Sequence, residues 1–153
     1  MKKIGEYTTR GIITSSDTES HRIQLFDGRF DTGYRVKSFD VAMSDRDNGN
    51  QFIASVKLMT EPDDNNRYWN FGKNTQIAWA GCGWDADTYY NNYEFRTMID
   101  PDNMIVEDLY IGALVYNDQA VEVNYMITLE KYDITDWQGA LAMVRNRSQG
   151  APP

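Results

Sequence analysis

Apolar and polar residues alternate along much of this chain, as they do in β-strands that have one buried and one wet face. The longest alternation runs from Val121 to Glu130, where every second side chain is Val, Tyr, Ile or Leu. A slip of one residue would turn this apolar stripe towards water, so we expect its register to be fixed. Residues 104–111 form a second apolar stretch, and Asn117-Asp118-Gln119 lies between the two as a turn. The pattern predicts a long β-hairpin.

Similar alternations predict strands in the rest of the chain. Residues 51–60 place Phe52, Ala54, Val56 and Leu58 on one face. A change of phase near Lys37-Ser38 predicts a β-bulge or a break, and Asp27-Gly28 predicts a tight turn. The remaining predicted strands cover residues 4–14, 21–26, 34–43, 69–71, 77–80 and 89–98, with 69–71 and 77–80 forming a second hairpin around Gly72-Lys73-Asn74.

One short helix is predicted at residues 135–147. Thr135 and Gln138 form a capping box, in which each side chain can satisfy a free backbone N–H of the first turn. Trp137 and Leu141 begin an apolar stripe at helical spacing. The chain is therefore predicted to be one domain over residues 1–153, an all-β antiparallel β-sandwich of about eight strands with a jelly-roll-like arrangement and a C-terminal α-helix.

Length, charge and cysteine count narrow the class of protein. A chain of 153 residues can bury one sizeable core without disulfides, and Cys82 has no second cysteine to pair with. The net charge of −8 disfavours direct contact with nucleic-acid phosphates. Neither a signal peptide nor an apolar run long enough to span a bilayer is recognisable, so we expect a soluble protein without a membrane partner.

Catalytic chemistry finds little support in the sequence. His21 is the one histidine. It could act as a base for Cys82 as nucleophile, but no feature of the sequence places the two residues together. No nucleophile elbow and no phosphate-binding glycine loop is present. A glycosidase needs two carboxylates at a set separation. With 23 acidic residues some pair will always satisfy that requirement, so it does not distinguish an enzyme from another kind of protein. We expect no enzyme and no cofactor.

The acidic turn at residues 45–50 begins like a calcium loop, with Asp45 and Asp47 as candidate ligands. Its glycine stands at the fifth position, however, and Val56 occupies the place of the bidentate acid. A solvated turn is the favoured interpretation, and sites built from His or Cys are excluded by the residue counts.

Aromatic side chains are the main candidates for a functional surface. The chain has ten Tyr, four Trp and six Phe, which suit strands, subunit interfaces and sugar-binding platforms alike. The candidates for a subunit interface or a glycan platform are Trp69, Phe71, Trp84, Tyr89, Tyr90 and Tyr93, together with Trp137. A glycan platform requires Trp69, Trp84 and Tyr90 to be exposed and coplanar, whereas burial in the core or between subunits is the favoured alternative.

The segment Asp100-Pro101-Asp102-Asn103, followed by residues 106–111, resembles small virion structural proteins of uncultivated marine bacteriophages. The likeness extends through Asn124-Tyr125 to the helix that ends near Arg147, and covers about residues 100–150. It implies a jelly-roll capsid or capsid-associated protein and brings no catalytic residues. Because the chain has no basic arm, an outer-shell or decoration role is favoured over genome packaging.

Two functions follow as expectations. The first is a self-associating viral structural protein, a homo-oligomer that contacts other virion proteins and is assembled into the virion in the host cytoplasm. The second is a carbohydrate-binding β-sandwich that recognises glycans through the aromatic cluster. The mass in solution separates them, because only the first requires self-association.

Overall fold

The computed structural model describes residues 2–44, 52–84, 93–115 and 120–134. Eight β-strands occupy these ranges: β1 (Lys2–Thr14), β2 (His21–Ile23), β3 (Thr32–Met43), β4 (Phe52–Met59), β5 (Gln76–Trp84), β6 (Tyr93–Ile99), β7 (Leu109–Val115) and β8 (Glu122–Asp133). The described residues include no helix, and accordingly none that is long and apolar enough to cross a membrane. The helix predicted at residues 135–147 lies outside the description.

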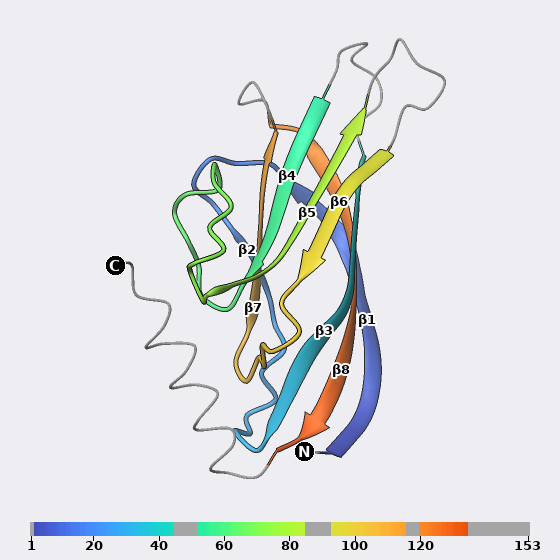
Figure 1. Cartoon of the computed structure of the whole chain (residues 1–153), viewed down its shortest axis with the longest axis vertical. Helices are drawn as coiled ribbons and strands as arrows, with labels where there is room; N and C mark the ends of the chain where they lie inside the picture. Colours follow the sequence, from blue (N-terminus) through green and yellow to red (C-terminus); the bar gives the residue numbers. More distant parts are fainter. Residues whose placement is uncertain (1, 45–51, 85–92, 116–119, 135–153) are drawn as a thin grey trace.

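The strands form two antiparallel sheets that face each other as a β-sandwich (Figure 1). One sheet has three strands in the order β1-β8-β3, and the other has five in the order β2-β7-β4-β5-β6. Sequence alternation explains the layers, because each strand turns one set of side chains to the space between the sheets and the other set outward. The predicted all-β sandwich of about eight strands is confirmed.

The core lies between the two sheets and draws on the apolar face of each strand. The four residues predicted to face inward between 51 and 60 are all buried there, and so is the apolar stripe of β8. Phe39 of β3 and Ile127 of β8 are adjacent across the three-stranded sheet and are almost completely buried. These inward faces agree with the period-two pattern.

Two local predictions are also confirmed. The register between β3 and β8 shifts between Val36 and Ser38, so a β-bulge accommodates the change of phase there. Gly28 has a φ of 86°, and the carboxylate of Asp27 accepts the backbone N–H of Arg29 at 3.0 Å. The chain therefore turns at Asp27-Gly28, as its sequence indicates.

The predicted hairpin of residues 104–132 is wrong. β7 pairs with β2 and β4, whereas β8 pairs with β1 and β3, so the two strands belong to opposite sheets. The β1–β2 loop separates them: Ser15 donates its N–H to the carbonyl of Val121, and Ser16 donates to that of Ala113, both at 2.9 Å. Alternation indicates which face of a strand is buried but not which strand lies beside it. The expected turn at residues 117–119 lies outside the described residues.

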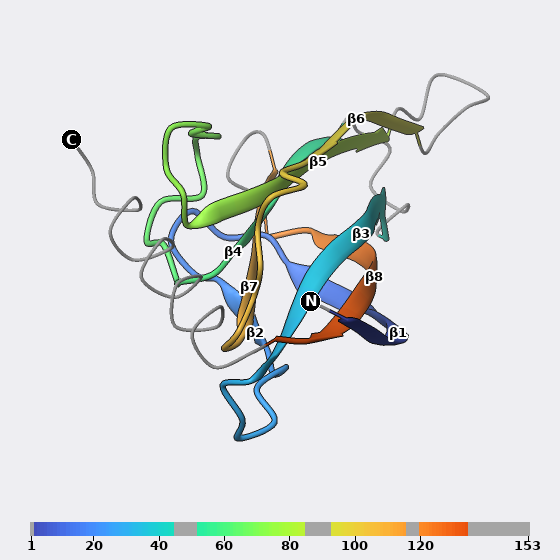
Figure 2. The same cartoon turned by 60° about the horizontal axis from the view of Figure 1, so that its bottom comes forward.

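The hairpin predicted within residues 69–80 is also wrong. Residues 60–75 contain no strand and form a long β4–β5 connection that folds over the outer face of the five-stranded sheet, the face turned away from the core (Figure 2). β5 instead pairs with β4 and β6. The connection is held by a side chain beneath it rather than by strand pairing.

That side chain is Lys57 of β4, which is only 1% exposed although it points away from the core. Its ammonium group donates to the carbonyl of Asn65 at 2.6 Å and to that of Tyr68 at 3.4 Å. It also lies 3.4 Å from a carboxylate oxygen of Asp63, which pairs with Lys73 as well. Burial lowers the pKa of Lys57. The buried cation organises the connection, because the connection supplies its acceptors.

Candidate functional site

The aromatic residues predicted as one surface are divided between the two faces of the five-stranded sheet. Trp84, at the end of β5, is part of the core and only 6% exposed, whereas Trp69 and Phe71 belong to the β4–β5 connection on the outer face. Trp84 therefore does not present its ring to solvent as a glycan platform requires. Tyr93 begins β6 and the placement of its side chain is not described; Tyr89, Tyr90 and Trp137 lie outside the described residues, as do Asp45 and Asp47.

Phe71 packs against Trp79 of β5. Its ring meets that of Trp79 edge to face, with centroids 4.7 Å apart and an interplanar angle of 80°. The side-chain Oε1 of Gln76 accepts both the Trp79 indole N–H at 3.0 Å and the Asn70 backbone N–H at 2.8 Å. Phe71 and Tyr68 remain 60% and 67% exposed. The connection thus holds the Phe71 ring on a fixed base and leaves the Tyr68 ring in solvent.

The structure does not bring the two candidate catalytic residues together. His21 lies in β2 and Cys82 in β5, and two strands stand between them in the five-stranded sheet. Three strand spacings alone put about 14 Å between the two strands, and the β5 residue in line with His21 is Ala78 rather than Cys82. Cys82 points into the core. Among the described residues, no group of three or more His, Cys, Asp or Glu side chains could hold a metal ion.

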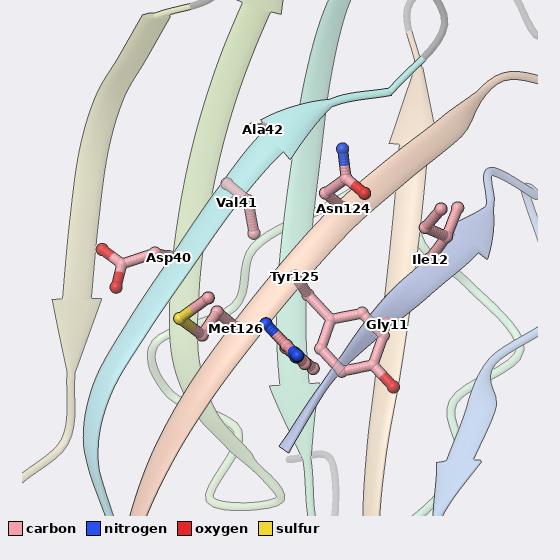
Figure 3. Close-up of a pocket in the computed structure, with 9 residues that line it drawn as sticks. Gly11, Ile12, Asp40, Val41, Ala42, Asn124, Tyr125 and Met126 are labelled. Carbon is pink, nitrogen blue, oxygen red and sulfur yellow. The ribbon is translucent and has the colours of Figure 1, made fainter. Parts of the chain in front are cut away.

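A groove of about 540 Å³ crosses the outer face of the three-stranded sheet (Figure 3). Two rows of cross-strand neighbours line it: Arg10, Met126 and Asp40 form one row, and Ile12, Asn124 and Ala42 form the other. Met126 therefore lies between a cation on β1 and an anion on β3, and Ile12 adds apolar surface in the neighbouring row. Such a surface suits a partner segment that offers apolar side chains and charges of both signs.

Strand β1 forms the border of this groove and of the sheet itself. In the part of the chain that the structure describes, β1 pairs with β8 alone, so one side of a 13-residue strand has no neighbour. Three large apolar side chains of the strand, Ile4, Tyr7 and Ile12, are 50–56% exposed. Long edge strands with exposed apolar residues are sites where another strand can add. β1 is therefore the best candidate for an interaction surface.

Ion pairs fix charged side chains near one end of β1. Lys3 lies 2.8 Å from Glu130 and 2.9 Å from Glu6, and Lys37 of β3 lies 3.1 Å from Glu6. Hydrogen bonds from Lys3 and, to a smaller extent, from Lys37 lower the pKa of Glu6. The hydrogen bonds that Lys3 donates to Glu130 and to Glu6 raise the pKa of Lys3. Exposed pairs of this kind add little to stability. Their effect is to hold Glu6 ionised, with its carboxylate between Lys3 and Lys37 on the three-stranded sheet.

Sequence reasoning recognised 4–14 as strand but missed its part in a surface. The signal that could have found it is the strand's composition: its apolar residues do not keep one alternating phase, so some of them must face solvent.

The sequence matches no protein-family model, and comparison with curated proteins finds no similar chain.

Proposed function

We propose that this chain is a self-associating structural protein of a virus particle, a capsid or capsid-decoration component with a jelly-roll fold. The observation that carries the proposal is the strand order. A jelly roll arises when a ribbon of eight antiparallel strands, in which first pairs with last, folds over on itself. The pairs β1–β8, β2–β7 and β4–β5 are those of such a ribbon, and β8–β3 and β7–β4 are the neighbours its folding creates.

The fourth pair of the ribbon would be β3–β6. β6 pairs with β5 instead, yet it also packs against β3, so the difference is confined to one edge of the sandwich. Jelly rolls are common among viral capsid proteins, which supports a place in a bacteriophage virion beside other virion proteins. Lectin domains share the fold, so the fold alone leaves a second candidate.

Self-association is supported by the exposed edge of β1. A free-standing monomer would leave its backbone donors and acceptors and three apolar side chains in water. In an assembly those groups would be covered by another subunit, and a closed assembly of identical subunits would have rotational symmetry. The proposal therefore requires a discrete oligomer.

The experiment that tests it is the mass in solution across a hundredfold range of concentration, measured by light scattering. The expected result is a discrete multiple of 17.7 kDa, a dimer or a larger closed assembly. A mass of one chain at every concentration would overturn the proposal.

Glycan recognition remains the second candidate because Tyr68 and Phe71 are both exposed in the β4–β5 connection. Rings of this kind can stack on sugar faces, with amide groups such as Asn70 nearby to bond hydroxyls. Binding on a glycan array that is lost in Tyr68→Ala and Phe71→Ala, and kept in the buried-ring variant Trp84→Phe, would favour it. An array without binding would remove it.

A further inference from the structure

We propose that β1 pairs antiparallel with β1 of a second copy, around a two-fold axis at Thr8, so that two three-stranded sheets become one of six strands. This inference rests on the proposed self-association and names its surface, its partner and its register. It follows from three features of β1: the direction of its free backbone groups, the order of its charges, and the position of its exposed isoleucines.

The backbone groups that face the free edge can be assigned from one hydrogen bond. Ser15 donates its N–H to Val121, and the antiparallel register continues along β1 with Ile13 opposite Val123 and Gly11 opposite Tyr125. Because hydrogen-bonded and non-bonded pairs alternate in an antiparallel ladder, the odd-numbered residues from 7 to 13 bond to β8. The even-numbered residues Glu6, Thr8, Arg10 and Ile12 therefore turn their N–H and C=O groups to the open side.

A two-fold axis at Thr8 makes this open side complementary to itself. Thr8 faces Thr8 of the second copy, and Glu6 faces Arg10 twice, once on each side of the axis. The exposed Ile4 comes opposite the exposed Ile12, and Gly5 comes opposite Gly11. Thr8 is also the midpoint of Lys2–Thr14, so the strands overlap along their whole length. Opposite charges and apolar pairs at directly facing positions are the contacts that stabilise antiparallel strands.

Neighbouring registers lose these contacts. An axis at Tyr7 sets Ile4 against Arg10, and an axis at Thr9 sets Glu6 against Ile12. An axis at Arg10 or at Glu6 brings that residue against its own copy, which places like charges together. Of the axes from Glu6 to Arg10, the one at Thr8 alone pairs Glu6 with Arg10 and Ile4 with Ile12. The sequence of β1 thus specifies one register.

The pairing closes on itself. A two-fold contact uses the open side of β1 in both copies and leaves none for a third, so it forms dimers rather than fibres. The bulge between Lys3 and Gly5 lies at the two ends of the paired region, where it interrupts the ladder least. Arg10 and Ile12 also border the outer groove, so Glu6 and Ile4 of the second copy would extend that groove across the axis.

A charge exchange tests the register. Arg10→Glu would set two pairs of carboxylates in contact, and Glu6→Arg two pairs of guanidinium groups, so each variant alone should raise the dimer dissociation constant at least about tenfold. Mixed together, the two variants have an opposite charge at every such position, and a heterodimer should form with wild-type affinity. Sedimentation velocity of each variant and of the mixture measures this. A mixture as weakly associated as its components would overturn the register.

Backbone and cysteine variants test the edge itself. Thr8→Pro removes an N–H that faces the open side and leaves the bonds to β8 intact, so the fold should persist while association is lost. Thr14→Pro is the matched control, because its N–H also faces outward but at the end of the paired region. Thr8→Cys should form a disulfide with its copy on mild oxidation, since facing residues of a bonded pair lie about 5.5 Å apart. Thr14→Cys, opposite Lys2, should not.

The outcomes separate this inference from the function on which it rests. A wild-type chain that is monomeric at every concentration would overturn both. An oligomer that withstands Thr8→Pro, with Thr8→Cys failing to cross-link, would overturn pairing through β1 and leave self-association standing. An oligomer whose mass falls by half or more in Thr8→Pro, with association restored by mixing the charge variants, would support both.

Discussion

Gly112 is predicted to be a position where one methyl group loosens the outer layer of the five-stranded sheet. It lies in β7 opposite Lys57, and a Cβ added there would stand 2.3 Å from the side-chain oxygen of Asn66. Asn66 is buried and donates to the carbonyls of Ser16 and Glu19, both at 2.8 Å. This amide joins the β4–β5 connection to the β1–β2 loop, so Gly112→Ala acts on both.

The magnitude follows from that geometry. An ordinary contact of a methyl carbon requires about 3.4 Å or more, so Asn66 has to move by about 1 Å, which breaks or stretches both hydrogen bonds. Each is worth about 1 kcal/mol, and the carbonyls left behind are partly desolvated. We expect Gly112→Ala to lower the free energy of unfolding by about 2–4 kcal/mol, which corresponds to a fall of about 5–15 °C in Tm.

Urea unfolding followed by tryptophan fluorescence measures the change. Gly72→Ala is the matched control, because its new Cβ would meet only the side chain of Asn70, at 3.3 Å, in an exposed turn. In an Asn66→Ala background the methyl group at position 112 fills vacated space, so the second substitution should cost less than about 0.5 kcal/mol. A loss below about 0.5 kcal/mol for Gly112→Ala in the wild-type background would refute the reasoning.

Three further outcomes are expected. Lys57→Met should lower the free energy of unfolding by about 2–4 kcal/mol, because Asp63 and two carbonyls lose a buried cation, whereas the more exposed Lys73→Met should cost under about 1 kcal/mol; urea titrations of both compare them. Burial opposes ionisation of Asp108, but two backbone N–H groups and Arg22 outweigh it and hold its pKa below the usual value. The ionised Asp108 therefore adds fully to the free energy of unfolding above about pH 4, and this contribution is lost as the pH falls through the folded-state pKa. Asp108→Asn should lower the free energy of unfolding by about 2 kcal/mol at pH 7 and by less at pH 3, as urea titrations at the two pH values would show. The Phe71→Ala variant should lose about 1 kcal/mol and change the emission of Trp79, as denaturation with fluorescence detection would show.

The parts of the fold that the sequence predicted are those where one strand's own pattern decides the outcome. In β4, Phe52, Ala54 and Val56 face the core because a shift of one residue in register would turn these apolar side chains out of it. The bulge near Ser38 was visible because a change of apolar phase within one strand needs an extra residue. These are local consequences of side-chain polarity.

What the sequence could not predict depends on contacts between distant segments. β7 and β8 follow each other in the chain but lie in opposite sheets, and the loop that separates them comes from the N-terminal region. Lys57 occupies an outward position, where a lysine is expected in water, yet residues 60–75 cover it. Likewise Trp84 was a surface candidate by composition and is core by position. In each case a partner remote in sequence overrides the local pattern.

The outer faces of the two sheets are covered to different extents, which explains why the candidate interaction surface lies on the three-stranded sheet. The outer face of the five-stranded sheet is covered at Lys57 by its own chain: the β4–β5 connection supplies acceptors to the Lys57 ammonium group, and the Asn66 amide N–H group donates to the β1–β2 loop. The three-stranded sheet has no such layer among the described residues: its outer face keeps an open groove, and its edge strand keeps Ile4 and Ile12 in water. A chain that covers part of one outer face and leaves a long, self-complementary edge strand beside the other has the asymmetry expected of a subunit, because β1 has a free edge in the part of the chain that the structure describes, and a second copy can pair there. Loss of association on Thr8→Pro, with the fold intact, is the result this asymmetry requires.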